Sequence, residues 1–396
     1  MAAGSICWGL IDVTDIETTV WECLRDEALF RLRRNGRFLV ADLKGVHQVI
    51  STSVRLGGWS DRIEWLVNHQ SCEGTAHLER HRAMTEGGLE SYHDRVCAEV
   101  ALPADRTAVM GTAANMNYVA IEQESDEDVS VTAAVTAGVE GNATTAGEPA
   151  TWRESDAGVT KVPVYAGTIN TMLFINRPLT PAAMARVVMT MTEGKTAALQ
   201  RLAVPSKLHI DLATGTGTDQ YCVAAPASGG KTLSSASTHM KLGEIIGLAT
   251  RNATIEALRW QNGLEMSYTR GVFHALGRFG IREATIFEDI TPFLNAADLE
   301  LLKKNSKAAF YEPLVGAAGH AMAAVADRVR HGTLPASVAD DATTQQAATL
   351  AANLAAQPCR WAEFRALLRP HATGGVKALV LRAVALGWSE KWRARD

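Results

Sequence analysis

Residues 167–179 read Gly167-Thr-Ile-Asn-Thr-Met-Leu-Phe-Ile-Asn-Arg-Pro-Leu179. Apolar and β-branched residues dominate this run, so we expect a buried strand over residues 162–175. Thr180 and Pro181 follow in the order that begins a helix, with a capping hydroxyl first and proline at the first helical position. We expect this helix to continue to about residue 202. A buried strand followed directly by a long helix is therefore the centre of the fold.

The segments on either side repeat this pattern. Residues 129–139 are rich in Val, Thr and Ala and predict another strand, and residues 207–213 and 220–225 predict two more. Residues 240–260 carry apolar side chains at helical spacing. The middle of the chain thus reads strand, strand, helix, strand, strand, helix. This order predicts an α+β fold with layered sheets and helices packed on them.

The first part of the chain gives weaker signals. Residues 14–34 suggest a helix, and the runs 37–43 and 46–52 suggest one antiparallel hairpin after the turn signal Asn35-Gly36. We further expect irregular or helical structure around 62–67 and a polar helix and loop over 71–105. A buried strand over 107–112, a short helix near 113–118 and an exposed acidic turn over 122–128 should follow.

The character of the sequence changes at about residue 263. Ala, Leu, Arg and Gln dominate from there, and strand signals are few. Helices are expected over 296–310, 313–331, 342–356, 360–368 and 376–386. We therefore divide the chain into an α+β part, residues 1–264, and an α-helical C-terminal domain or extension, residues 265–396. The second part could serve oligomerisation, cover a ligand or bind a partner, and its residues do not favour one of these roles.

Composition excludes several classes of protein. The chain has 396 residues, of which 47% are hydrophobic and 21% charged, so it can bury a large core. A net charge of −4 provides no broad basic surface and argues against nucleic acid as the main partner. The six cysteines include no CxxC pair and indicate reduced thiols. Neither a signal peptide nor a membrane span is evident, so we expect a cytoplasmic protein without a membrane partner and leave a homo-oligomer open.

A series of short blocks carries the chemistry. Their residue ranges are 135–142, 146–149, 167–179, 192–199, 213–219 and 238–247. In this order the blocks resemble the signature of the adenosylcobinamide amidohydrolases, the CbiZ family, and Asn68-His-Gln70 resembles that family's N-terminal block. The resemblance covers roughly residues 40–260. Asn176, Arg177 and Gly194 depart from the family pattern.

This resemblance implies a reaction and a substrate. The enzyme would hydrolyse the amide that joins aminopropanol to the corrin ring of adenosylcobinamide. The products would be adenosylcobyric acid and 1-amino-2-propanol, in the salvage of incomplete corrinoids. No cofactor or resident metal is implied, because cobalt would enter only as part of the corrinoid substrate.

A more distant resemblance concerns mechanism. Residues 167–179 also resemble the strand that opens the catalytic subunit of DmpA-like aminopeptidases and ornithine acetyltransferases, which have an αββα, N-terminal-nucleophile (Ntn) type of fold. In that group a Gly precedes a Ser or Thr that becomes an N-terminal nucleophile after self-cleavage. Thr168 matches the nucleophile and Asp219 matches the Asp that closes the Gly-rich turn.

The chemistry of these residues is consistent with such a site. A free α-amine has a pKa near 8 and can take the proton of its own Thr hydroxyl. Asn142, which follows a Gly-containing bend, can donate to an oxyanion. We therefore consider Thr168 a candidate nucleophile and Asn142 a candidate oxyanion donor. In the alternative interpretation, Thr168 is an ordinary strand residue and Asn142 caps a turn.

His239 has two candidate roles. It could act as a general base that Asp219 orients, or it could approach the cobalt of the substrate. A helix-start histidine bonded to the backbone is an equally good interpretation. Further residues in these blocks could bind the amide side chains of a corrin or could form surface pairs instead: Asn68, His69, Glu193, Lys195, Thr216, Lys241 and Glu244.

Two other patterns suggest different functions. Residues 225–232 fit a loose phosphate-binding loop that ends in Lys231-Thr232, but the residues after it begin a helix poorly. Cys72, His77, His81, His93 and Cys97 could bind zinc, although their spacings match no standard site. Apart from the corrinoid amidohydrolase, the alternatives are an Ntn-type amidase or acyltransferase acting on another amide, and a corrinoid-binding protein without turnover.

Overall fold

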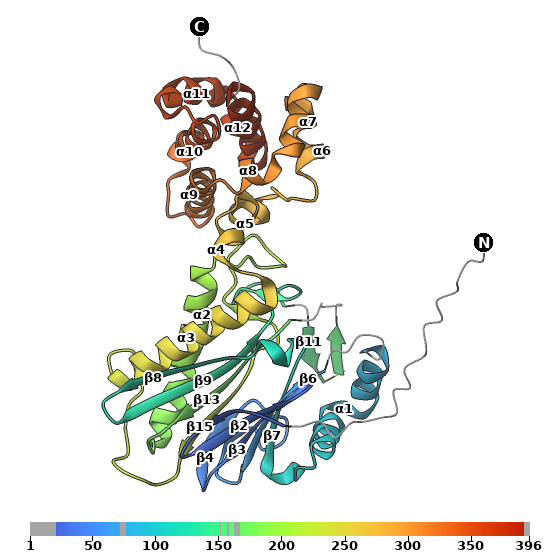
Figure 1. Cartoon of the computed structure of the whole chain (residues 1–396), viewed down its shortest axis with the longest axis vertical. Helices are drawn as coiled ribbons and strands as arrows, with labels where there is room; N and C mark the ends of the chain where they lie inside the picture. The colour runs from blue at the N-terminus through green and yellow to red at the C-terminus, as the bar shows by residue number, and fades with distance from the viewer. Residues whose placement is uncertain (1–20, 72–76, 151, 157, 162–166, 392–396) are drawn as a thin grey trace, which may run out of the picture.

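The computed structural model describes residues 21–71, 77–150, 152–156, 158–161 and 167–391 (Figure 1). Two sheets stack on each other in the lower part of Figure 1. The first sheet has the order β1 (Glu22–Asp26), β2 (Phe30–Asn35), β3 (Phe38–Leu43), β6 (Trp65–Gln70) and β7 (Thr107–Thr112). The second has the order β5 (Gly58–Ser60), β4 (His47–Ser51), β15 (Gln220–Pro226), β13 (Ile169–Ile175), β9 (Val129–Ala137) and β8 (Ala120–Asp126).

Strand β13 lies in the interior of the second sheet and is buried on both faces. It pairs in parallel with β15 and antiparallel with β9. Because side chains alternate along a strand, Ile169 and Leu173 pack toward helices α2 (Pro181–Arg201) and α3 (Lys241–Asn262). Met172 and Phe174 pack toward the first sheet, where the rings of Phe174 and Phe30 stack with their centroids 3.9 Å apart.

A third apolar cluster covers the other face of the first sheet. Phe38, Val40 and Val67 pack there against Val96 and Cys97 of helix α1 (His77–Glu99). The order of layers is therefore α2 and α3, second sheet, first sheet, α1. This arrangement confirms the expected α+β fold with an αββα order of layers.

Several local expectations for the N-terminal part were wrong. Residues 22–34 form strands β1 and β2 rather than a helix, and residues 65–70 form strand β6. The runs 37–43 and 46–52 do not pair with each other, because β3 pairs with β2 and β6 while β4 pairs with β15 and β5. Residues 122–126 of the acidic run belong to strand β8, which is paired with β9, and only Glu127 and Asp128 form the expected turn.

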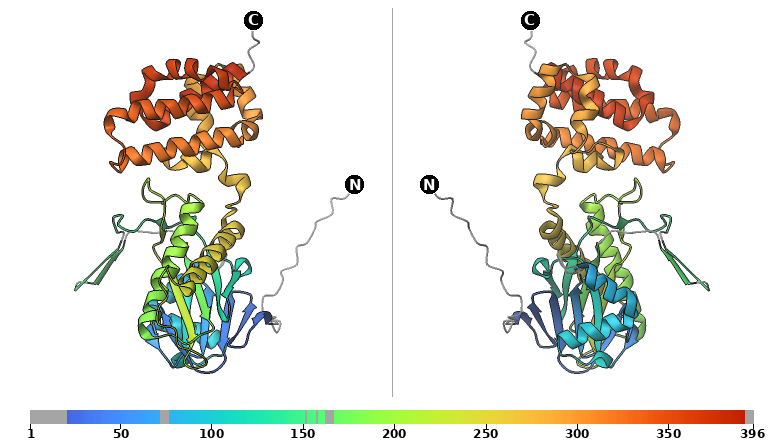
Figure 2. Two further views of the ribbon diagram at one scale, coloured as in Figure 1. Left: turned by 90° about the vertical axis from the view of Figure 1, so that its left-hand side faces the viewer. Right: turned by 90° about the vertical axis from the view of Figure 1, so that its right-hand side faces the viewer.

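Two short pairings lie near the start of β13. Strand β10 (Ala143–Thr144) pairs with β14 (Gly215–Thr216). The expected strand over 207–213 is irregular apart from a single bridge between Pro205 and Leu212. The hairpin of β11 (Trp152–Ser155) and β12 (Gly158–Lys161) projects from the body of the molecule, as Figure 2 shows.

The C-terminal part is helical, as expected. Its helices are α4 (Met266–Thr269), α5 (Val272–Leu276), α6 (Ile286–Ile290), α7 (Ala296–Lys304), α8 (Ser306–Phe310), α9 (Pro313–Arg330), α10 (Ala339–Leu354), α11 (Trp361–Leu368) and α12 (Gly375–Lys391). They enclose a core of their own, in which Trp388, Phe310 and Phe364 are the largest fully buried side chains. Among the described residues, no helix is long and apolar enough to cross a membrane.

The helical part lies over one end of the αββα layers, next to the C-terminal ends of α2 and α3 (Figures 1 and 2). The ring of His274 lies 2.6 Å from the carbonyl oxygen of Leu202, just after α2. Arg278 donates to the carbonyl oxygen of Ile210 at 2.7 Å. Arg330 forms an ion pair with Asp211. These contacts fix the helical part to the segment that follows α2.

Candidate functional site

Thr168 lies immediately before strand β13, at the end of the layers that faces the helical part. Its side chain is only 6% exposed. The hydroxyl oxygen of Thr168 lies 2.7 Å from the carbonyl oxygen of Gly167 and 2.7 Å from the hydroxyl oxygen of Thr218. The hydroxyl is therefore held next to the peptide group that joins it to the preceding residue.

Thr218 connects the other groups of this site. Its hydroxyl donates to the carbonyl oxygen of Gly167 at 2.8 Å and accepts from Asn142 Nδ2 at 3.2 Å. With these two bonds, the Thr218 oxygen retains a lone pair that can accept a hydrogen bond from Thr168. Thr218 lies in the block 213–219 but was not among the site residues predicted from the sequence.

Asp219 fixes the start of β13. One carboxylate oxygen accepts from the backbone N–H of Ile169 at 3.0 Å and from the hydroxyl of Thr216. The other accepts from the backbone N–H of Thr216 at 3.0 Å and forms an ion pair with Lys195 of helix α2. These four contacts connect Asp219 to β13, to the turn before β15 and to helix α2. Asp219 is therefore a positioning group.

Asn142 packs directly against Gly167. A Cβ atom at residue 167 would lie 2.4 Å from Asn142 Oδ1 and 3.0 Å from the carbonyl oxygen of Gly138, so only glycine fits there. Asn142 Oδ1 is buried and has no hydrogen-bond partner among the described residues. The glycine before Thr168 is thus a steric requirement of the site.

A buried polar network lies between the two sheets beside Thr168. Asn170, two residues along β13 and on the same face, donates to Asn68 Oδ1 at 2.8 Å and to the carbonyl oxygen of Gly111 at 3.1 Å. Asn68 donates in turn to the hydroxyl of Thr136 at 2.8 Å. These bonds join β13 and β9 to β6 and β7. Because a buried amide donor without a partner is costly, these bonds hold the two sheets together at this end, although Asn170 Oδ1 is buried without a partner among the described residues.

The structure brings Thr168, Asn142, Asp219, Lys195 and Thr216 together, with Asn68 nearby. The other candidate residues lie elsewhere. His239 is exposed just before α3, whose C-terminal residue Asn262 bonds to the backbone beside the site. A helix of this length separates the two ends by about 30 Å. Lys241 and Glu244 form an exposed ion pair at that distant end. Glu193 is exposed on α2.

His69 faces the opposite side of the first sheet from Asn68. Its Nδ1 lies 2.6 Å from the hydroxyl oxygen of Tyr92 in α1, and its ring stacks on Phe38 with centroids 4.8 Å apart. Burial lowers the pKa of His69 to about 4. This histidine is therefore a neutral part of the core between α1 and the first sheet, and it does not contact Thr168.

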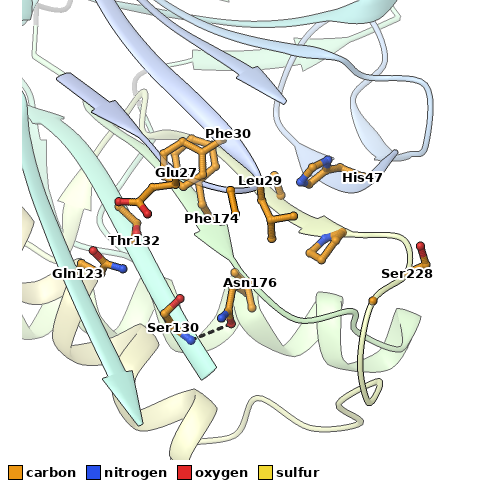
Figure 3. A pocket seen from close by; sticks show the side chains of 15 residues that line it. Glu27, Leu29, Phe30, His47, Gln123, Ser130, Thr132, Phe174, Asn176 and Ser228 are labelled. Carbon is orange, nitrogen blue, oxygen red and sulfur yellow. Dashed lines mark hydrogen bonds between the residues drawn. The ribbon is translucent and has the colours of Figure 1, made fainter. Parts of the chain in front are cut away.

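A separate cavity, with a volume of about 430 Å³, lies at the other end of β13. Figure 3 shows the side chains that line it. Its floor includes the stacked rings of Phe30 and Phe174, and none of the candidate site residues lines it. Asn176, at its edge, accepts from the backbone N–H of Ser130 at 2.8 Å. The family departures Asn176 and Arg177 therefore follow the last residue of β13, Ile175, at the opposite end of the strand from Thr168.

The two alternative patterns do not form sites in the described residues. After Pro226 the chain is irregular to residue 240 apart from a bridge between Leu233 and Leu179, and no helix begins where a phosphate-binding loop would need one. Cys72 lies outside the described residues, as do the side chains of His77 and His81. The ring of His93 lies 3.1 Å from the carbonyl oxygen of Ala104. Within the described part of the chain, no group of three His, Cys, Asp or Glu residues could hold a metal ion.

Comparison with known proteins places the chain among the amidohydrolases, enzymes that hydrolyse amide bonds. The family model described as adenosylcobinamide amidohydrolase, CbiZ, matches residues 22–266, more than half of the chain, and the chain belongs to this family. An uncharacterized protein of Methanocaldococcus jannaschii, MJ1613, is 34% identical over 186 residues, which cover 45% of this chain and 72% of the relative. The matched family region contains the whole site around Thr168 and ends where the helical part begins.

Proposed function

We propose that the protein hydrolyses the aminopropanol amide of adenosylcobinamide and releases adenosylcobyric acid and 1-amino-2-propanol, as a step in corrinoid salvage. Membership of the amidohydrolase family supports the substrate class. The buried cluster of hydroxyls and an amide around the Gly167–Thr168 peptide supports the site. Cobalt takes part only as a component of the substrate.

Thr168 is the proposed nucleophile, and it first has to become an N-terminal residue. In the continuous chain its nitrogen is part of the peptide bond to Gly167, so it cannot act as a base. Attack of Thr168 Oγ1 on the Gly167 carbonyl carbon would transfer the acyl group from nitrogen to oxygen. Water would then hydrolyse the resulting ester to a Gly167 carboxylate and a free Thr168 hydroxyl and α-amine.

The same groups would serve the substrate amide. The α-amine takes the proton of Thr168 Oγ1 as the oxygen attacks the amide carbonyl, and the proton then passes to the leaving aminopropanol nitrogen. Water hydrolyses the adenosylcobyryl ester on Thr168. Asn142 and Thr218 are the proposed donors to the oxyanion. Asp219 and Lys195 hold the start of β13 in place.

The contact that carries this proposal is the 2.7 Å approach of Thr168 Oγ1 to the carbonyl oxygen of Gly167. The test compares wild type with Thr168→Ala and Thr168→Ser by intact-protein mass spectrometry and by release of 1-amino-2-propanol from adenosylcobinamide. We expect wild type to separate between residues 167 and 168 and to turn over, Thr168→Ala to do neither, and Thr168→Ser to retain both at reduced rates.

Each failure has a distinct meaning. Turnover by Thr168→Ala at the wild-type rate would end the nucleophile role. If the wild-type protein is active but remains one full-length species, the α-amine of Thr168 cannot be the base. A corrinoid spectrum that shifts on binding without product would identify a binding protein instead of an enzyme.

A further inference from the structure

A second cavity lies between the helical part and the α+β part. Its volume is about 610 Å³. Lys207, Gln261 and Asn262 line it from the α+β part, and Tyr268 and Arg282 line it from the helical part. We call this space the interdomain cleft. It exists only because the helical part lies over this end of the αββα layers.

The interdomain cleft and the proposed catalytic site share one segment of chain. Gly138 donates its backbone N–H to the carbonyl oxygen of Thr168 at 3.0 Å. The next residue, Val139, donates its backbone N–H to Asn262 Oδ1 at 3.1 Å and lines the cleft. The segment 138–142 thus contacts the start of β13 on one side and the cleft on the other. A ligand in the cleft would therefore contact the segment that also holds the start of β13.

Two side-chain amides on the wall of the cleft have a fixed orientation. Gln261 Oε1 accepts from the backbone N–H of Asn115 at 2.9 Å, and Asn262 Oδ1 accepts from Val139. The amide nitrogens of both residues have no protein partner among the described residues, so each offers N–H groups to a ligand. The cations of Lys207 and Arg282 are exposed and likewise form no ion pair within the described residues. Glu140 and Glu283 also line the cleft.

We infer that the interdomain cleft binds the periphery of a large ligand that carries many carbonyl acceptors, and that the helical part forms one wall of the substrate site. This inference rests on the proposed function, because a corrin has carboxamide side chains around its rim. The N–H donors of the cleft match the amide oxygens, and the carboxylates of Glu140 and Glu283 match amide N–H groups. Leu264 and Phe273 supply apolar contact area.

Hydrogen bonds and ion pairs hold the walls of the cleft in a fixed position. Arg278, whose side chain is 5% exposed, forms a bidentate pair with Asp327 at 2.6 Å for both bonds while it donates to the carbonyl oxygen of Ile210. On the other wall, the backbone N–H of Lys207 donates to the carbonyl oxygen of Ala143 at 2.8 Å. The wall that contains Lys207 is therefore bonded to Ala143, the residue after Asn142, and Arg278 bonds the helical wall to Ile210, three residues after Lys207.

The test measures binding of adenosylcobyric acid, the proposed product, to the full-length protein by equilibrium dialysis, with detection by corrin absorbance. This ligand retains the carboxamide rim and has no scissile aminopropanol amide. The variant is Gln261→Glu with Asn262→Asp, because each carboxylate keeps the oxygen that accepts the backbone N–H and removes the N–H donors. We expect Kd to rise at least tenfold. A matched control, Lys241→Gln with Glu244→Gln at the distant end of α3, is expected to bind as wild type does.

A second variant keeps the inference testable if the double variant does not fold. Arg282→Gln changes one exposed side chain of the helical part and is expected to raise Kd about threefold or more without changing Tm. If wild type binds the ligand and both cleft variants bind it equally well, the interdomain cleft is not the binding site, whereas the proposed function stands. If wild type binds neither this ligand nor adenosylcobinamide, the proposed function and the cleft inference are both overturned.

Discussion

The hydroxyl oxygen of Thr218 lies 2.7 Å from that of Thr168 and 2.8 Å from the carbonyl oxygen of Gly167. A hydroxyl at this position can donate to the oxygen on which negative charge develops when Thr168 attacks. Thr218→Val removes the hydroxyl and nearly preserves the volume. We therefore expect chain separation after Gly167 and amide turnover to slow by about 10²–10³-fold, the usual cost of losing one oxyanion donor. Timed intact-protein mass spectrometry and aminopropanol release measure the two rates.

Thr218→Ser is the matched control for this prediction. Serine keeps the hydroxyl and loses only a methyl group, so both rates should stay within about tenfold of wild type. Circular dichroism should show that both variants keep the fold. Wild-type rates in Thr218→Val would mean that another donor stabilises the oxyanion.

Lys195 neutralises Asp219 from helix α2, and both side chains are largely buried, at 14% and 18% exposed. Lys195→Met retains most of the aliphatic volume but leaves the carboxylate without its cation. We expect the free energy of unfolding to fall by about 2 kcal/mol, less than for a fully buried pair because some water reaches this one. Urea denaturation measures the change.

Lys241→Met provides the comparison, because Lys241 forms an ion pair with Glu244 in which both side chains are well exposed, at 63% and 50%. Such exposed pairs contribute little, so no measurable change in the urea midpoint is expected. Equal effects of the two substitutions would show that Lys195 is not important for holding Asp219.

The sequence predicted the centre of the fold well because its signals are local. The apolar run of β13 depends only on neighbouring residues. The same holds for the cap of α2, where Thr180 accepts from the backbone N–H of Ala183. Strand β2 was missed although its alternation is present, with Phe30 and Leu32 buried and Arg31 and Arg33 not. A period of two over so few residues is easily interpreted as part of a helix.

Strand pairing and the details of the site depend on contacts far apart in the chain. Strands β3 and β4 are separated only by Lys44, Gly45 and Val46, yet they belong to different sheets. Nothing in these three residues indicates which strand will pair with β3 and which with β4. Thr218 is one of three threonines that alternate through residues 214–218. Its contact with Gly167 comes from the turn geometry, so composition could not distinguish it from the other two.

Gly194 is a departure from the family pattern for which the structure gives a reason. A Cβ atom at this position would lie 2.9 Å from the carbonyl oxygen of Gly247 and 3.2 Å from its Cα atom, where α2 and α3 cross closely. Gly194→Ala gains up to about 1 kcal/mol of helix propensity but costs about 1–3 kcal/mol through overpacking. We expect a net loss of stability, measured as a lower Tm.

Gly247→Ala is the matched control on the facing helix. A Cβ atom at residue 247 meets nothing within 4 Å, so the propensity gain of up to about 1 kcal/mol is unopposed. Its Tm should equal or exceed that of wild type. A higher Tm in Gly194→Ala would show that the two helices separate without cost and that close approach is not the reason for glycine.

Burial of His69 makes the stability of the fold sensitive to acid. The pKa of His69 is lowered to about 4 in the folded protein, from an ordinary value of 6.5. Between these two values the unfolded chain binds a proton that the folded chain does not. The contribution of neutral His69 to the free energy of unfolding is therefore fully present above about pH 6.5. It decreases as the pH falls toward 4. His47, His93 and His274 are also buried with lowered pKa values and act in the same direction.

His69→Phe removes this titration and keeps a ring to stack on Phe38. The variant loses the contact with the Tyr92 hydroxyl, so we expect it to be less stable than wild type at pH 7. The informative quantity is the decrease in unfolding free energy from pH 7 to pH 4.5, measured by urea denaturation at both values. This decrease should be smaller in the variant by about 2 kcal/mol. Equal decreases in the two proteins would mean that His69 takes up its proton as readily in the folded protein as in the unfolded chain.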